Sequence, residues 1–360
     1  MRGKIKYSFV LPCRNEELSV AECIRKIKKT AQGLPYEIIV VDNASTDDSA
    51  RIAKKEGARV IKEPRIGYGS AVLKGINVAR GEIIIMGDSD GTYDFSEFKR
   101  LVEKLSDSDI VLGSRMRGSI KEGAMPFLNR YIGNPMLRGT LNLFFRAHIS
   151  DPQTGFRAFR KSTIKKLDLK TTGMEFASEM LINALTKGLK ISEVPITYYP
   201  RRSSSKLRPL SDGWRHLRFL LMYSPTYLFI IPGAIIMLIG ISLLILYLLF
   251  NSPISTGILG SMLAILGYQI IGTGLYARTY SIVNGFTPHD PIIDTLARHF
   301  PLERTLLIGF LTFIVSVFGG LITAKQNVKS IPLIALTFLI IGLQTIFSGF
   351  FLSIMLVEKR

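Results

Sequence analysis

The stretch EIIIMGDSDG, residues 82–91, decides the fold of the first half of the chain. Its first part, Glu82–Met86, is a predicted strand so apolar that other elements must cover both of its faces. Asp88 and Asp90 follow directly on a turn. In sheets that helices cover on both faces, ligands collect at the carboxyl ends of the strands. The stretch therefore predicts a buried strand that carries two carboxylates to a ligand site.

Predicted strands and helices alternate on either side of this stretch, which is the pattern of a doubly wound α/β sheet. The expected strands are Lys6–Leu11, Glu37–Val41, Arg59–Ile61, Ile110–Gly113 and Lys190–Pro195. The expected helices are Glu16–Thr30, Asp47–Glu56 with Ser45 or Thr46 as its N-cap, Gly69–Ala79, Arg130–Phe145 and Gly173–Lys187. A basic turn, Ser114–Gly118, is expected after the strand that ends at Gly113.

The charge of the chain favours an anionic partner. Its 360 residues include 46 Lys and Arg against 28 Asp and Glu, a formal net charge of +18, and most of this surplus lies before residue 227. Because the second part is apolar, membrane lipids and phosphate substrates are the expected partners, and nucleic acid is not. Cys13 and Cys23 lack metal-ligand spacing and indicate a reducing compartment. No signal-length apolar core follows Met1–Lys6, so we expect the first part in the cytoplasm.

The second part of the chain holds four apolar stretches long enough to span a bilayer, which takes roughly 20 residues each. They are Tyr227–Phe250, Ile258–Ile282, Thr305–Ala324 and Ile331–Val357. The cations in the connection between the second and third spans favour a cytoplasmic location for that connection, in a multi-pass protein of the cell membrane. We predict three parts: a cytoplasmic α/β domain over 1–210, an interfacial amphipathic helix over 211–226, and a four-helix transmembrane anchor over 227–360.

Three groups of polar residues carry the candidate chemistry. Asp88 and Asp90 suit Mg²⁺ or Mn²⁺ and a diphosphate that the ion bridges, although an acidic turn with only local hydrogen bonds has the same sequence. Asp42 with Asn43 and Ser45, after the second strand, suits a ribose or a base edge, or an ordinary Asx turn or helix cap. Five cations on loops or helix starts are either solvated charges or phosphate contacts: Arg115, Arg117, Arg130, Arg202 and Lys206.

Five motifs together resemble the family 2 glycosyltransferases and, more narrowly, the dolichyl- or polyprenyl-phosphate hexose synthases. They are LPCRNEE (11–17), VVDNAST (40–46), GDSDGTY (87–93), GSRMRG (113–118) and DPQTGFRAFRK (151–161). The resemblance covers residues 1–225 and implies a GT-A fold with a mixed sheet, and a metal-dependent enzyme. It also implies inverting transfer of a hexose from a nucleotide-diphosphate sugar, UDP-glucose or GDP-mannose, to dolichyl or polyprenyl phosphate.

The resemblance assigns roles to residues by motif. The donor would be bound by Pro12, Arg14, Glu16, Asp42, Asp88, Arg202 and Lys206. The metal would be bound by Asp88 and Asp90, and the acceptor phosphate by Arg115, Arg130 and Arg117. The implied catalytic residues are Asp90, Arg115 and Arg130. The mannose synthases usually have Gln two residues after the second Asp of the metal motif. Here that position is Thr92, so glucose is favoured over mannose.

Two other functions remain open from the residues alone. A lipid phosphate is ionised at neutral pH and needs no general base, whereas transfer to a hydroxyl, as in glycolipid or polysaccharide synthesis, needs one. Asp151 or Glu175 is a candidate for that base. Alternatively, the spans would be the working part of a flippase or transport subunit without enzymatic activity. The spans hold almost no ionisable residues, and intramembrane charge marks transport paths, so an anchor is favoured.

Overall fold

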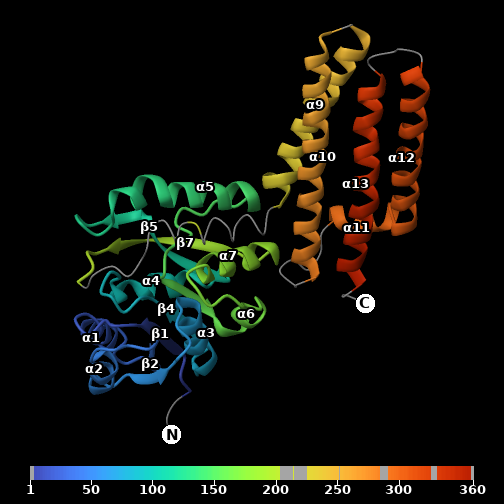
Figure 1. Ribbon diagram of the computed structural model, residues 1–360. Coiled ribbons are helices and arrows are strands. Elements are labelled where there is room, and N and C mark those ends of the chain that lie inside the picture. Colours follow the sequence, from blue (N-terminus) through green and yellow to red (C-terminus); the bar gives the residue numbers. More distant parts are fainter. Residues whose placement is uncertain are drawn as a thin grey trace. The chain divides into compact units, whose positions relative to one another are not determined.

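The computed structural model describes residues 4–202, 214, 225–250, 252–283, 291–325 and 331–357. The chain divides into two compact units, residues 1–220 and 221–360 (Figure 1). Lys206 and almost all of the predicted interfacial helix over 211–226 lie outside the described residues. The boundaries of the three parts predicted from the sequence therefore stay predictions.

The first unit is built on a seven-stranded sheet with the order β3-β2-β1-β4-β6-β5-β7. β1 is parallel to β2 and β4, whereas β6 runs antiparallel to its neighbours β4 and β5. The strands are β1 Tyr7–Cys13, β2 Tyr36–Asp42, β3 Arg59–Lys62, β4 Ile83–Met86, β5 Ile110–Ile120, β6 Arg157–Arg160 and β7 Ile191–Tyr198. The sheet is therefore mixed, as the resemblance implies, with a parallel half formed by β1 to β4.

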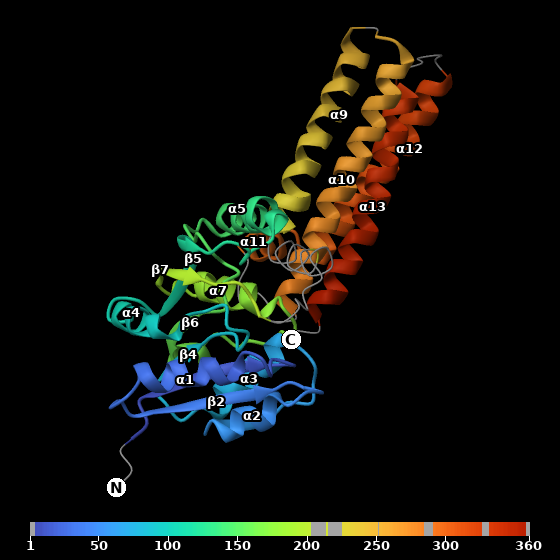
Figure 2. The same ribbon diagram turned by 90° about the vertical axis from the view of Figure 1, so that its left-hand side faces the viewer.

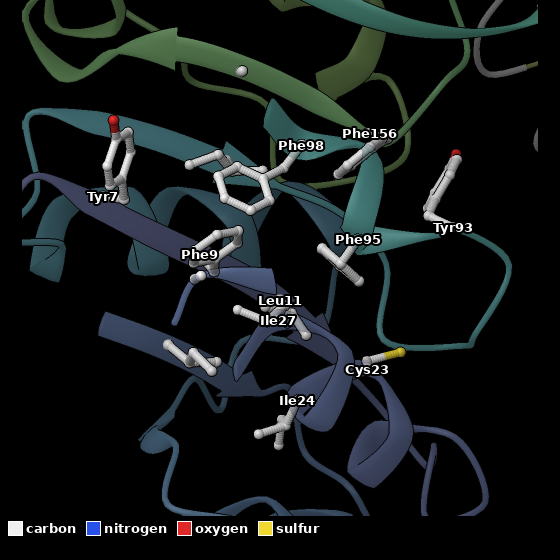
Figure 3. Close-up of a cluster of buried hydrophobic side chains, with 14 of the residues drawn as sticks. Tyr7, Phe9, Leu11, Cys23, Ile24, Ile27, Tyr93, Phe95, Phe98 and Phe156 are labelled. Atoms are coloured by element: carbon white, nitrogen blue, oxygen red, sulfur yellow. The ribbon is translucent and has the colours of Figure 1, made fainter. Parts of the chain in front are cut away.

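Helices cover both faces of this sheet. They are α1 Val20–Thr30, α2 Ser49–Lys55, α3 Tyr68–Val78, α4 Phe98–Lys104, α5 Asn134–Phe145, α6 Lys161–Lys165 and α7 Phe176–Thr186, with the short turns η1 Phe95–Glu97 and η2 Asn129–Gly133. Phe9 and Leu11 of β1 pack with Ile24 of α1 and Phe98 of α4 in the main core (Figure 3). Alternate side chains of a strand point to opposite faces. The opposite face of β1 is covered by α3, which also contacts α7. The carboxyl ends of β1, β2 and β4 are thus held between two helical layers.

Three local predictions differ from the structure. Residues 114–118 are not a turn but lie within β5, whose pairing with β7 breaks between Ser114 and Ser119, so the basic segment forms an irregularity inside a strand. The helix expected from residue 47 begins at Ser49, and the Asp47 carboxylate, rather than a hydroxyl of the predicted caps, accepts the Ser49 N–H at 3.0 Å. The hydroxyl of Ser45 instead accepts the N–H of Asn15.

Strand β6 has no counterpart among the predicted strands, and it carries a fully buried cation. The guanidinium of Arg157 is 0% exposed and donates to the carbonyls of Pro152, Thr154 and Ala177 at 2.9, 2.9 and 3.0 Å. A buried guanidinium is tolerated only when its donors are satisfied. Arg157 therefore ties the loop before β6 to helix α7.

The second unit consists of long apolar helices that run side by side (Figures 1 and 2). They are α9 Ile231–Leu249, preceded by the turn η3 Thr226–Ile230, α10 Ile254–Val283, α12 Leu302–Lys325 and α13 Ile331–Val357, with the short helix α11 Pro291–His299. Four segments have the length and composition of membrane spans: Thr226–Leu249, Ile254–Val283, Leu302–Ile322 and Ile331–Leu356. This confirms the four predicted spans, of which the second begins four residues earlier than expected.

Candidate active site

A cavity of about 800 Å³ lies at the carboxyl ends of β1 and β4. Its wall is formed by the loop after β1, the turn after β4, the start of α3, the segment 123–134, the loop before α7, and the residues that follow β7. The lining residues include Pro12, Arg14, Glu16, Asn43, Tyr68, Asp88, Asp90, Thr92, Asn129, Asn134, Glu175, Tyr198 and Arg201. This is the edge of the sheet where the sequence predicts a ligand site.

The acidic turn after β4 is fixed to the end of β1. The hydroxyl of Ser89 donates to the carbonyl of Pro12, and the hydroxyl of Ser19 donates to the carbonyl of Ser89, both at 2.8 Å. Thr92 donates its N–H and its hydroxyl to Asp90 Oδ1 at 3.1 and 2.6 Å. Thr92 therefore orients the second carboxylate of the motif.

Asp88 is half-buried in the floor of this site, and its Oδ1 atom is fully buried. Its Oδ1 has no hydrogen-bond partner among the described residues, and a side chain on Gly155 would come within 2.7 Å of its Oδ2. Burial, and secondarily the negative charge of Asp90, raise the pKa of Asp88 to about 7. A buried carboxylate oxygen without a partner, beside a second carboxylate, fits a divalent cation. No group of three His, Cys, Asp or Glu side chains suited to a metal occurs in the described part of the chain, so waters and substrate phosphates would complete such a shell.

Arg201 is the cation that reaches this acidic cluster. Its guanidinium pairs with Glu16 and lies 3.6 Å from Asp90 Oδ2. The residue predicted for this role from the sequence is the neighbouring Arg202, which pairs with Glu22 of α1 at 2.6 Å and is absent from the cavity lining. The two adjacent arginines look alike in the sequence, and only the course of the chain beyond β7 separates them.

The predicted nucleobase residues Pro12, Arg14 and Glu16 all line the cavity, but Asp42 does not. Asp42 is buried and accepts the N–H of Ser45 at 3.0 Å, which is the Asx-turn arrangement considered above. The next residue, Asn43, lines the cavity and accepts the N–H of Gly67 at 2.8 Å. Asn43, which the sequence groups with Asp42 as a candidate for the ribose or base edge, therefore lies at the cavity and joins β2 to the start of α3.

The three predicted acceptor cations lie outside the lining. Arg115 is buried and donates to both carboxylate oxygens of Asp151 at 2.7 and 2.8 Å, with its guanidinium 5.1 Å from the centre of the Tyr198 ring. Arg117 pairs with Glu193 at 3.2 Å, and Arg130 is exposed beside the Tyr131 ring. Arg115 thus contacts the lining residue Tyr198 without lining the cavity itself. Its two hydrogen bonds keep the Asp151 carboxylate paired with a cation.

The segment 123–134 forms the opposite wall and exposes apolar side chains. Asn129 and Asn134 line the cavity, while Phe127 is 72% exposed and Ile132 is 55% exposed. Leu128 and Tyr131 in the same segment, and Met136 and Leu143 further along the chain, are exposed in the same way. The sequence predicts a helix here but not its exposed apolar surface.

A doubly wound mixed sheet with two carboxylates at the end of β4, followed by four apolar membrane helices, defines a membrane-bound glycosyltransferase with a GT-A-like fold. Residues 8–168 match the model of glycosyl transferase family 2, and residues 275–356 match the family 2 C-terminal transmembrane region. The chain belongs to glycosyltransferase family 2. The resemblance to this family, and the glycosyltransferase activity that it implies, are confirmed.

Two relatives and one solved structure give the family its context. The low-salt glycan biosynthesis hexosyltransferase Agl6 of Haloferax volcanii is 37% identical over 96% of this chain and 88% of its own length. The dolichol-phosphate mannosyltransferase of Pyrococcus furiosus is 31% identical over 66% of this chain and 70% of its own. Glucosyl-3-phosphoglycerate synthase of Mycobacterium tuberculosis, solved with Mn²⁺, UDP and glucosyl-3-phosphoglycerate, is 23% identical, covers 62% of this chain and 81% of its own, and has a TM-score of 0.50. This last likeness shows the shared fold.

Proposed function

We propose that this glycosyltransferase moves a hexose, with glucose favoured and mannose next, from a nucleotide-diphosphate sugar to dolichyl or polyprenyl phosphate. An oxygen of the lipid phosphate attacks the anomeric carbon as the bond to the nucleoside diphosphate breaks. In-line attack inverts this centre, so an α-linked donor gives a β-linked lipid-phosphate sugar. The relatives named as a hexosyltransferase and a dolichol-phosphate mannosyltransferase support this class of reaction.

The observation that carries the proposal is the contrast between the two walls of one cavity. One wall holds Asp88 and Asp90, which suit a metal diphosphate. The other is the segment 123–134, which lines the cavity with amides and exposes apolar side chains such as Phe127 beside it. A lipid phosphate is an amphiphile that needs both a polar site and an apolar surface.

The described residues supply positioning and charge, which is what phosphate attack requires. Arg201 already lies at the carboxylates and is suited to bind the donor diphosphate. We propose Pro12, Arg14 and Glu16 at the nucleobase. Arg115, Arg117 and Arg130 remain candidates for the acceptor phosphate, and for Arg115 this requires access past Tyr198.

Asp88 and Asp90 are the residues that we propose to hold Mg²⁺ or Mn²⁺. When bound there, the ion would neutralise charge on the departing diphosphate. The residues themselves prepare the site, because Thr92 orients Asp90 and the space beside Gly155 accommodates Asp88. The structural neighbour crystallised with Mn²⁺ and UDP supports this choice of ion.

We also propose that the first unit lies in the cytoplasm at the cell membrane. The cations of the connection after the second span support this orientation. The described spans carry no group that would mark a transport path through their middle, and the chain belongs to an enzyme family, so a transport function has no support.

Transfer to a hydroxyl acceptor is a second candidate that one observation favours. Of the two possible bases, Asp151 is bound to Arg115, but Glu175 lines the cavity and its Oε2 has no hydrogen-bond partner in the described part of the structure. A base at Glu175 would suit a sugar hydroxyl. The lipid-phosphate reaction is preferred because the apolar surface of the segment 123–134 suits a lipid acceptor.

A transfer assay tests the proposal. Purified full-length protein in detergent is given radiolabelled UDP-glucose or GDP-mannose, polyprenyl phosphate, and Mg²⁺, Mn²⁺ or a chelator. We expect metal-dependent label in the lipid phase, with a β-linkage by NMR. Label only on a hydroxyl acceptor, or an α-linked product, would contradict the proposal.

A further inference from the structure

The loop that precedes α7 is held through four consecutive residues, 170–173. The N–H groups of Gly69 and Ser70 in the first turn of α3 donate to the carbonyls of Gly173 and Thr172 at 3.2 and 3.1 Å. The carboxylate of Glu179 accepts three hydrogen bonds from residues 170 and 171 at 2.6 to 2.9 Å. These bonds fix the loop directly before Glu175, which lines the cavity.

The carboxylate of Glu175 has room but no partner. A side chain on Gly173 would come within 2.4 Å of Glu175 Oε2, so this glycine leaves the space that the carboxylate occupies. Glu175 lines the cavity, and its Oε2 is buried without a hydrogen-bond partner among the described residues. Tyr68, on the neighbouring start of α3, lines the same cavity, and its buried hydroxyl lies near the Asp88 carboxylate but makes no hydrogen bond of normal length to a described residue. Such groups cost free energy unless a ligand satisfies them.

The usual structural roles do not explain this carboxylate. Glu175 immediately precedes α7, yet its side chain makes no capping hydrogen bond to that helix. It forms no ion pair with any described residue. It also does not combine with Asp88 and Asp90 into a three-carboxylate metal group in the part of the chain that the structure describes.

We infer that Glu175 binds the hexose of the donor, by accepting hydrogen bonds from sugar hydroxyls, with Tyr68 as a second contact. An ionised carboxylate is only an acceptor, and the hydroxyls of a hexose are the donors it lacks. This inference rests on the proposed function, because it assumes a nucleotide-diphosphate sugar in the cavity. A site built to hydrogen-bond a hydroxyl rejects ligands that lack it, so Glu175 would also help to select the sugar.

Binding of nucleotides with and without the sugar tests this role. Isothermal titration calorimetry on the full-length protein in detergent would compare UDP with UDP-glucose and GDP with GDP-mannose. The variants are Glu175→Ala, Glu175→Gln, and Glu103→Gln as a matched control on the exposed side of α4. We expect Glu175→Ala to weaken the binding of the nucleotide sugar about tenfold while the binding of the free nucleotide stays unchanged. Glu175→Gln keeps one acceptor oxygen, so its affinity for the nucleotide sugar should lie between those of the wild type and Glu175→Ala. Glu103→Gln should bind all four ligands as the wild type does.

The outcomes separate this inference from the proposed function. Equal weakening of free nucleotide and nucleotide sugar by both Glu175 variants would mean a structural role and would overturn the inference. Unchanged binding of both ligands, with transfer abolished in Glu175→Gln, would instead make Glu175 the base for a hydroxyl acceptor. If the wild-type protein binds none of the four ligands, the proposed function fails, and the inference fails with it.

Discussion

The two walls of the cavity differ in how they are built. The wall at the acidic turn is fixed by buried hydrogen bonds, such as those from Ser89 to Pro12 and from Thr92 to Asp90. The wall formed by residues 123–134 is exposed to solvent and carries apolar side chains such as Phe127. A small, highly charged donor needs carboxylates and cations that are already in place, whereas a long lipid needs surface. The difference suggests that donor and acceptor binding can be disrupted separately.

The largest effect is expected at the acidic wall. Replacing Asp90 by Asn removes a charge proposed to hold the metal, so we expect transfer to fall by about 10²–10³-fold. Initial rates over a range of Mg²⁺ or Mn²⁺ concentrations measure the loss. The matched control is Asp107→Asn, which removes an exposed carboxylate that pairs with Lys104 outside the cavity. Full activity of the Asp90 variant would remove Asp90 from the site.

Packing beneath the acidic wall is the next test. In Gly155→Ala the new methyl group would lie 2.7 Å from Asp88 Oδ2, so the carboxylate must move. Small displacements of reacting groups can cost up to about a hundredfold in rate, and we expect a loss of roughly ten- to a hundredfold. Thermal unfolding should accompany the kinetics, because overpacking also destabilises by about 1–3 kcal/mol. An unchanged rate in a folded variant would mean that the position of Asp88 is not critical.

The exposed wall should respond only to the lipid. The double variant Phe127→Ser with Leu128→Ser removes two exposed apolar side chains beside the cavity. We expect the KM for polyprenyl phosphate to rise about tenfold, since an apolar side chain that becomes covered contributes about 1.5–3 kcal/mol. The KM for the donor should stay the same. A rise in the donor KM alone would assign this wall to the donor.

The rates at which cysteines react compare the buried part of the first unit with the exposed wall, without a measurement of catalysis. Burial, the largest cause in each case, raises the pKa of Cys13 to about 11 and that of Cys23 to about 12. A thiol is reactive as the thiolate, and at pH 8 these groups are at most about one part in a thousand ionised, so iodoacetamide should label them slowly in the folded protein. A cysteine introduced by Ile132→Cys on the exposed wall should react at the rate of a free thiol, as mass spectrometry would record. Rapid labelling of Cys13, which lines the cavity, or of Cys23, which lies in the main core, would mean that this part of the first unit opens.

The sequence was sufficient for the parallel half of the fold and for the spans. The short apolar run Glu82–Met86 is stable only in a sheet that is covered on both faces, and the long apolar run Tyr227–Phe250 is stable only in a bilayer. Length and hydropathy are therefore enough to predict the structure of both. Strand β6 was not predicted because it is short, carries Arg157 and Arg160, and pairs antiparallel with residues far away in the chain. Pairing of that kind leaves no local pattern.

The candidate site was predictable only where a motif ends a strand. Asp88 and Asp90 follow β4 directly, so their location follows from that of the strand. Asn43 likewise directly follows β2, whereas no motif at the end of a strand marks Arg201 or Glu175. From the sequence, Glu175 is only one of two candidate bases. The structure is needed to see that its Oε2 is buried without a hydrogen-bond partner among the described residues.

Arg157 has a consequence for the exchange of parts between related enzymes. Its guanidinium donates hydrogen bonds to carbonyls of the loop before β6 and to a carbonyl in the first turn of α7. One buried cation therefore holds both the loop that adjoins Asp88 and the start of the helix that follows Glu175. A chimera that imports only the loop before α7 would leave these carbonyls in a foreign arrangement. The block from Asp151 to α7 is therefore the smallest piece that recombination could move intact, and sugar preference should be inherited with it as a unit.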